Sequence, residues 1–107
     1  MILNRQETRQ WESAGYEGMQ ISTVWNIGGE HGDGSFFLKF DKGTCFPLHE
    51  HDGWEQILML EGTIRFGEVV LNAGDSLLLD ANDQHDALAL SDAKFFVAHH
   101  GGITIVA

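Results

Sequence analysis

The stretch GTCFPLHEHDGWE, at residues 43–55, holds two histidines and a glutamate at close spacing. His49 and His51 are two residues apart, so an extended strand places both imidazoles on one face. Asp52-Gly53 has the composition of a turn, and Glu55 begins the returning segment, where its carboxylate can come back beside the two rings. Two imidazoles and a carboxylate from adjacent strands suit Fe, Mn, Zn, Ni or Cu. The stretch therefore predicts a metal site between paired strands.

Short apolar segments separated by turn residues fill the rest of the chain. Residues 19–27 alternate, with Ile21, Thr23 and Trp25 on one side, and predict a strand. Further strands are expected at 36–40, 54–60, 63–66, 69–71, 76–79, 85–90, 94–99 and 103–106. Strands this short, joined by Gly, Asp and Asn turns, indicate a barrel or sandwich. With no long amphipathic helix, linker or repeat, the sequence predicts one all-β domain over residues 1–107.

The glycine-rich segment 28–35, GGEHGDGS, is interpreted as a hairpin loop. It resembles a phosphate-binding loop only in its glycines, because no Lys-Ser/Thr pair ends it and no helix is expected after it.

The charge balance excludes several partners. Six Lys and Arg against 16 Asp and Glu give a formal net charge of −10, which repels phosphate backbones and anionic lipid. We therefore expect neither nucleic-acid nor membrane binding. Cys45 is the single cysteine, so no internal disulfide can form. The first residues lack the apolar stretch of a signal peptide, and no run approaches the roughly 20 apolar residues of a membrane helix. A cytoplasmic location is expected.

The spacing G-x5-H-x-H-x3-E-x6-G is formed by Gly43, His49, His51, Glu55 and Gly62. It resembles the first motif of the cupin superfamily at every fixed position. The resemblance implies a double-stranded β-helix, the cupin jelly-roll barrel of RmlC-like proteins, in a single domain. Residues from about 36 to 100 would form the barrel core, and residues 1–18 an N-terminal arm.

The second cupin motif is matched in part. Gly74 and His85 stand in place, whereas Asp80 replaces the proline, Asn82 replaces the second glycine and the final asparagine is absent. Asparagine tolerates the left-handed conformation nearly as well as glycine, so we expect the turn before His85 to persist. The resemblance implies one divalent transition metal, Fe, Mn, Zn or Ni, with the ligands His49, His51, Glu55 and His85.

A narrower resemblance covers most of the chain. Trp11 and the segments 18–22, 37–43 and 58–62 are similar to the cupin domain of ChrR-type anti-sigma factors, a group that also resembles acetylacetone-cleaving dioxygenases. In the anti-sigma proteins a separate N-terminal helical zinc domain holds the sigma factor. The 107 residues leave no room for that domain, so we do not expect the anti-sigma function to carry over.

Several residues near the motif have two readings. Ile57 and Met59 share the parity of Glu55, so they face the barrel interior as plain core or as pocket wall. Cys45, four residues before His49, could line the pocket mouth, although burial as a small hydrophobe is favoured.

Residues outside the ligand set suggest further contacts. Gln56, Leu58 and Leu60 face outward and form an apolar stripe, which predicts a sheet-on-sheet homodimer of the kind that cupins commonly form. His99 and His100 end a strand, so one of them points inward. A surface or supporting role is favoured over ligation for both.

Two functions remain open on this reading. The first is a metal-dependent enzyme acting on a small carbonyl or dicarbonyl compound, a dioxygenase with Fe, or an isomerase, lyase or hydrolytic enzyme with another metal. The second is a non-catalytic module that senses a small ligand, a metal or oxidative stress. A metal-free structural barrel is disfavoured by the full ligand set. A catalyst should carry a polar acid–base group inside the barrel besides the ligands.

Overall fold

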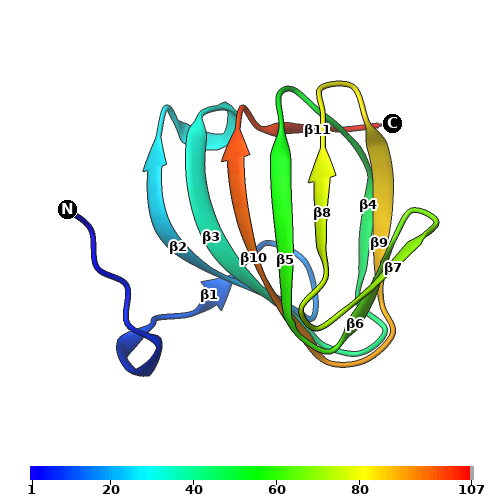
Figure 1. The fold of residues 1–107 in the computed structure, drawn as a ribbon, viewed down its shortest axis with the longest axis horizontal. Helices are drawn as coiled ribbons and strands as arrows, with labels where there is room; N and C mark the ends of the chain where they lie inside the picture. Colours follow the sequence, from blue (N-terminus) through cyan, green and yellow to red (C-terminus); the bar gives the residue numbers. More distant parts are fainter. Residues whose placement is uncertain (107) are drawn as a thin grey trace.

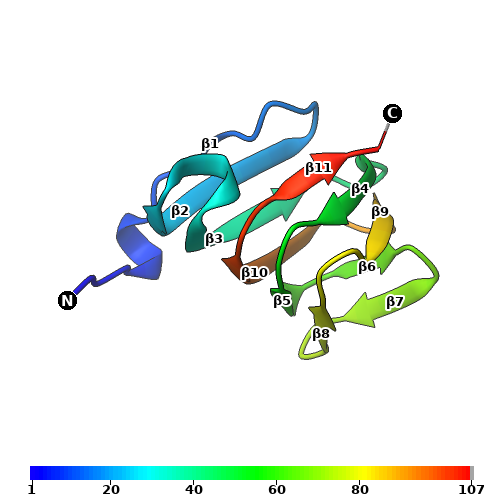
Figure 2. The ribbon, with the colours of Figure 1, turned by 90° about the horizontal axis from the view of Figure 1, so that it is seen from above.

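Two antiparallel sheets form the fold of residues 1–106, which the computed structural model describes (Figure 1). The six-stranded sheet has the order β1-β2-β3-β10-β5-β8, and the five-stranded sheet has the order β11-β4-β9-β6-β7. Seen from above, the sheets lie as two layers that approach each other along one side (Figure 2). This architecture confirms the expected all-β jelly-roll domain. In the described residues no helix is long and apolar enough to cross a bilayer.

The strands have the following bounds: β1 Glu12–Ser13, β2 Met19–Ile27, β3 Asp33–Phe40, β4 Cys45–His51, β5 Glu55–Glu61, β6 Thr63–Phe66, β7 Val69–Asn72, β8 Ser76–Leu79, β9 Gln84–Ala89, β10 Ala93–His100 and β11 Ile103–Ile105. Two 3-10 turns, η1 (Gln6–Thr8) and η2 (Gly29–His31), complete the elements.

Strand β3 begins three residues earlier than the sequence predicted. The expected start was Phe36, but Asp33 already pairs with Ile27 of β2. The intervening Gly34 lies so close to β2 that a Cβ atom there would approach the carbonyl oxygen of Trp25 to 2.5 Å. The glycine therefore permits tight strand pairing at a position where composition alone indicated a loop.

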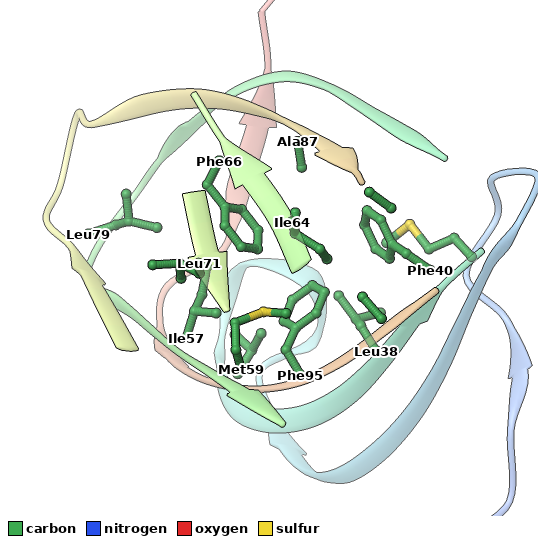
Figure 3. Packing of buried hydrophobic residues seen from close by; sticks show 14 residues of the cluster. Leu38, Phe40, Ile57, Met59, Ile64, Phe66, Leu71, Leu79, Ala87 and Phe95 are labelled. Carbon is green, nitrogen blue, oxygen red and sulfur yellow. The ribbon is translucent and has the colours of Figure 1, made fainter. Parts of the chain in front are cut away.

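The hydrophobic core lies between the two sheets. Strand β5 shows the alternation that builds it, because Ile57 and Met59 are buried while Leu58 and Leu60 are 39% and 37% exposed. Phe66 from β6 and Phe95 from β10 meet edge to face, with ring centroids 5.5 Å apart (Figure 3). Aromatic contacts across the barrel thus hold the two sheets together beside the site.

The N-terminal segment lies against the outer face of the six-stranded sheet. The guanidinium of Arg9 sits 3.5 Å from the ring centroid of Phe37, and the ammonium of Lys39 lies 4.0 Å from the ring centroid of Trp11. Two cation–π contacts therefore attach the arm to β3. Beyond them the first residues project away from the sheets (Figure 1), and Ile2 is 65% exposed.

Candidate metal centre

Three buried histidines meet between β4 and β9. His49 and His51 lie on β4, and His85 lies on β9 as the direct partner of His49. The three residues are 4%, 2% and 6% exposed. One nitrogen from each ring can be chosen so that all lie within 4.8 Å of one another. The structure thus brings together the three histidines that the sequence singled out.

Each of these rings is oriented by a main-chain carbonyl. In every case Nδ1 is the contacting atom, and since a carbonyl oxygen only accepts, Nδ1–H must donate. The bonds run from His49 to Pro47 (2.8 Å), from His51 to Asp83 (2.7 Å) and from His85 to Asp86 (2.9 Å). In a neutral ring so oriented, the lone pair is on Nε2, which is the usual arrangement in histidines that bind metals.

The Nε2 atoms of the cluster indicate a bound ligand. Nε2 of His51 and Nε2 of His85 are both buried and have no hydrogen-bond partner. Leaving a buried polar atom without a partner costs about 1–3 kcal/mol. A divalent cation would accept these lone pairs, so the residues present fit a metal ion of the kind that imidazole ligands favour.

Glu55 reaches the site from the opposite sheet, at the start of β5. One carboxylate oxygen lies 3.1 Å from Nε2 of His51, and the side chain is 15% exposed. The two atoms lie within ion-pair distance, but they are not aligned for a hydrogen bond, so Nε2 has no hydrogen-bond partner. Glu55 therefore stands at the edge of the three-histidine cluster, where it can contribute a carboxylate oxygen or hold a proton.

Burial and charge set the protonation of the three rings. Burial lowers the pKa of His49 to about 4 and also lowers the pKa of His85. Burial acts in the same direction on His51, but the Glu55 carboxylate and the Asp83 carbonyl outweigh it, so the pKa of His51 is raised. The lowered pKa values favour the neutral form of His49 and His85 at pH 7, and a neutral ring keeps its Nε2 lone pair.

The turn before β9 keeps its shape despite the missing glycine. Asn82 has a φ of 73°, the left-handed conformation expected for it. Its N–H donates to the carbonyl of His51 at 2.8 Å, while the N–H of His51 donates to Asp83 at 3.2 Å. The turn therefore fixes the position of the Asp83 carbonyl, which also accepts a hydrogen bond from Nδ1 of His51.

A cavity of about 690 Å³ adjoins the histidines. Its wall is mainly apolar and aromatic and includes Phe36, Phe46 and Trp54. The wall also contains the polar side chains of Tyr16, Thr23, Asn26, Glu30, His49, Glu55, His85 and His99. This volume and lining suit a small, largely apolar molecule.

Cys45 lies outside, contrary to the expectation that it is buried or lines the pocket. The thiol residue is exposed, and the cavity wall contains Phe46 instead. The pairing of β4 with β9 shifts register between Phe46 and His49, so a bulge at residues 47–48 reverses the alternation. Pro47 was the available signal, since proline within a strand marks an edge or a bulge.

Ile57 and Met59 belong to the core. They are 1% and 0% exposed, and neither is among the residues that line the cavity. Their inward direction agrees with the parity argument. Of the two readings left open, core and pocket wall, the structure favours core.

Comparison with known proteins places the chain in a family. A profile described as the ChrR cupin-like domain matches residues 1–104. The chain belongs to this family. No match was found among curated proteins. Membership confirms the narrower resemblance that the sequence segments indicated.

Solved structures share the cupin fold of the family. A proposed acetylacetone dioxygenase from Methylibium petroleiphilum PM1 is similar with a TM-score of 0.89 and 15% identity, over 100% of this chain and 81% of that chain. The acetylacetone dioxygenase from Acinetobacter johnsonii gives a TM-score of 0.82 and 10% identity, over 100% and 77%.

The complex of Rhodobacter sphaeroides SigE with the anti-sigma ChrR contains a matching chain with 28% identity and a TM-score of 0.74. The match covers 89% of this chain and 51% of that one. This cupin therefore spans about half the length of that relative.

Proposed function

We propose that this cupin holds one divalent transition metal through His49, His51, His85 and Glu55 and acts on a small carbonyl or dicarbonyl compound as an oxygenase-type enzyme. The observation that carries the proposal is the set of buried Nε2 atoms. Three rings are held through Nδ1 by carbonyls, and two of them leave a buried Nε2 without a partner. Fe, Mn, Zn and Ni all accept such ligands.

The chain's own residues supply the rest of the chemistry. A bound metal would provide Lewis acidity for a carbonyl group and, if it is iron, electrons for O₂ chemistry. Glu55, 3.1 Å from His51, can hold a proton next to the site. The largely apolar walls of the cavity, about 690 Å³ in volume, would limit the water around a bound substrate. The likeness in fold to acetylacetone dioxygenases makes acetylacetone the first substrate to test.

Elemental analysis of protein purified without added metal tests the metal site. We expect near-stoichiometric transition metal in the wild type and at least a tenfold loss in His49→Ala, because ligand geometry determines retention. His100→Ala is the matched control, since His100 is exposed and pairs with Asp33 at 2.7 Å. Equal metal in the wild type and His49→Ala would refute the proposal.

O₂ uptake by iron-loaded protein tests the reaction. Acetylacetone should increase O₂ consumption in the wild type, and the increase should disappear in His49→Ala. If the iron-loaded wild type consumes no O₂ with acetylacetone, the dioxygenase assignment is refuted. The proposed metal site would still stand.

A sensing module is the second candidate. The family match and the 28% identity to a chain of the SigE–ChrR complex support it. A sensor would bind metal and a small ligand without turnover, and its fold or self-association would change on oxidation. Limited proteolysis before and after peroxide treatment would show such a change.

We further propose a homodimer in the cytoplasm. Leu58 and Leu60 are exposed on the outer face of β5, and Leu78 on the neighbouring β8 is 57% exposed. A second copy covering this face would remove an apolar patch from water. The net charge of −10 supports a small-molecule ligand over nucleic acid or anionic membrane.

A further inference from the structure

A third histidine lines the cavity besides His49 and His85. His99 lies near the end of β10, directly opposite Glu55 on β5 and Gly34 on β3. Directly opposed residues of paired strands project from the same face of the sheet, so His99 is a neighbour of Glu55. It is not part of the cluster whose nitrogens lie within 4.8 Å of one another. His99 is therefore placed to contact a ligand instead of the metal.

The hydrogen bond at Nδ1 decides what His99 offers to the cavity. Nδ1 lies 2.6 Å from the carbonyl oxygen of Gly101, which can only accept, so Nδ1–H donates. In the neutral ring the lone pair is then on Nε2. Within residues 1–106 the structure shows no hydrogen bond to that atom. His99 thus presents a free acceptor.

The neighbours of the ring fix its direction. The ring of Phe36 packs against His99 with centroids 5.6 Å apart. On the opposite strand Gly34 carries no side chain, and a Cβ atom there would lie 3.3 Å from Nε2 of His99. Nε2 therefore lies close to the backbone of Gly34, at a position where a side chain would crowd it.

The wall around the acceptor is mostly apolar. Glu55 beside it is a second acceptor, and the surrounding wall is formed largely by aromatic and aliphatic side chains such as Phe36 and Phe95. A ligand that presents an O–H group to this end would satisfy a polar atom inside an apolar cavity, where such a match discriminates strongly. A ligand without the O–H group would leave the acceptor unpaired.

We propose that His99 is the ligand-selecting residue of the cavity and accepts a hydrogen bond from an enol or hydroxyl O–H of a compact, largely apolar substrate. The proposal rests on the proposed function, because the metal would hold another oxygen of the same molecule. It narrows the substrate class from carbonyl compounds in general to those that enolise or carry a hydroxyl next to the carbonyl group.

Calorimetric binding to zinc-loaded protein tests this role without turnover. The probes are acetylacetone and its analogue in which both hydrogens of the central carbon are replaced by methyl groups, so that it cannot enolise. The wild type should prefer acetylacetone. His99→Leu should reduce that preference by about fivefold, the value of one typical hydrogen bond. His99→Gln should retain most of it, because its amide oxygen can accept near the position of Nε2.

His100→Leu is the matched control, because the neighbouring ring is exposed and pairs with Asp33. It should bind both probes as the wild type does. An unchanged preference in His99→Leu would overturn the proposal. So would a zinc-loaded wild type that binds neither probe, and in that case the metal site would still stand.

Nitrogen NMR of the metal-free protein provides a second readout. The neutral His99 ring should carry its proton on Nδ1, where it donates to Gly101, and a free lone pair on Nε2. A proton on Nε2 would refute the role of His99 and leave the proposed metal function untouched. Failure of the wild type to bind zinc would refute the metal function, and the NMR result would still decide whether His99 offers an acceptor.

Discussion

His49 and His85 are direct partners across the antiparallel pair of β4 and β9, and their ring centroids lie 4.3 Å apart. Two neutral imidazoles held this closely, with His51 beside them, form a site that is costly without a cation. The buried Nε2 of His85 has no partner in the protein. Metal affinity and folding stability should therefore be linked through these rings.

His85→Leu tests that link. The substitution removes a buried Nε2 that has no partner and also the hydrogen bond from Nδ1 to Asp86, whose carbonyl keeps the N–H of Gly67 as a donor. The two effects should nearly cancel. The unfolding free energy of the metal-free protein should change by less than about 1 kcal/mol in this variant. The wild type should gain about 2.7 kcal/mol at a free zinc concentration one hundred times Kd, whereas the variant should gain almost nothing. Urea denaturation with and without zinc measures both quantities, and equal zinc stabilisation of both proteins would contradict the link.

The pH dependence of the metal-free protein should report His49. Its pKa falls from 6.5 to about 4 on folding because the ring is buried. The unfolded chain therefore binds a proton that the folded chain does not as pH falls from 6.5 to 4, and stability is lost in that window. The loss attributable to His49 is roughly 3 kcal/mol, at about 1.36 kcal/mol per pKa unit.

His51 affects stability in the opposite direction, because folding raises its pKa. Its contribution to the free energy of unfolding is present at low pH and is lost as pH rises through the folded pKa. The test is therefore the difference between the wild type and His49→Gln. Denaturation at pH 7 and pH 4 should show that the wild type loses more stability than the variant. Parallel losses would show that His49 is not neutral when folded.

The bulge at residues 47–48 predicts which of two neighbours is chemically accessible. Cys45 is exposed, so a thiol reagent should label the native protein stoichiometrically without releasing metal. Phe46, in contrast, packs edge to face on His49 with centroids 4.9 Å apart. Phe46→Ala should enlarge the cavity and destabilise the protein by about 3 kcal/mol. A Cys45 thiol that reacts only after unfolding would contradict the bulge.

Gly62 and Gly74 form a matched pair for backbone strain. Both have positive φ, 78° and 93°. A Cβ atom at Gly74 would meet nothing within 4 Å, whereas one at Gly62 would collide with the carbonyl oxygen of Asp92 and lie 2.9 Å from Cα of Ala93. Gly74→Ala should cost about 1–2 kcal/mol for conformation alone, and Gly62→Ala should cost about 1–3 kcal/mol more from crowding. Thermal denaturation of both variants measures the difference, and equal losses would argue against the crowding.

The proposed homodimer depends on the outer face of β5 and β8. A lysine at Leu58 or Leu78 would place charge in the buried patch of a dimer, so either variant should be monomeric. Light scattering after size exclusion gives the mass directly, and circular dichroism checks that the fold persists. Lysine at Val70, which is 47% exposed on β7 of the other sheet, is the control. If the wild type is monomeric at every protein concentration tested, the dimer proposal is refuted.

The sequence was sufficient for the site because its spacing is local. Two-residue alternation places His49 and His51 on one face of β4, and Glu55 follows one turn later. The prediction that these residues lie on paired strands was wrong, because β4 and β5 belong to different sheets and Glu55 meets His51 across them. His85 came from the partial second motif, and its meeting with His49 depends on long-range pairing that only the family pattern could anticipate.

The sequence-based predictions were wrong where a bulge interrupts the alternation of a strand and where a glycine-rich segment forms part of a strand. Parity counted back from His49 places Cys45 inside, but the bulge at residues 47–48 inverts it. Gly34 was interpreted as loop although it pairs with β2 at close range. In both cases the deciding contact lies in a neighbouring strand that local patterns do not specify. The inward side of the His99–His100 pair was undetermined for the same reason.

Main-chain carbonyls accept the hydrogen bond from Nδ1 of all three histidine rings. A carbonyl persists whatever side chain its residue carries. Substitutions at Asp83 and Asp86 can therefore alter local charge without removing the acceptor that aims each imidazole. The orientation of the histidine rings should therefore persist when the side chains of these neighbouring residues change. A change of substrate could then arise from the cavity wall alone, at positions such as Phe46 or His99, while the three histidines keep their arrangement.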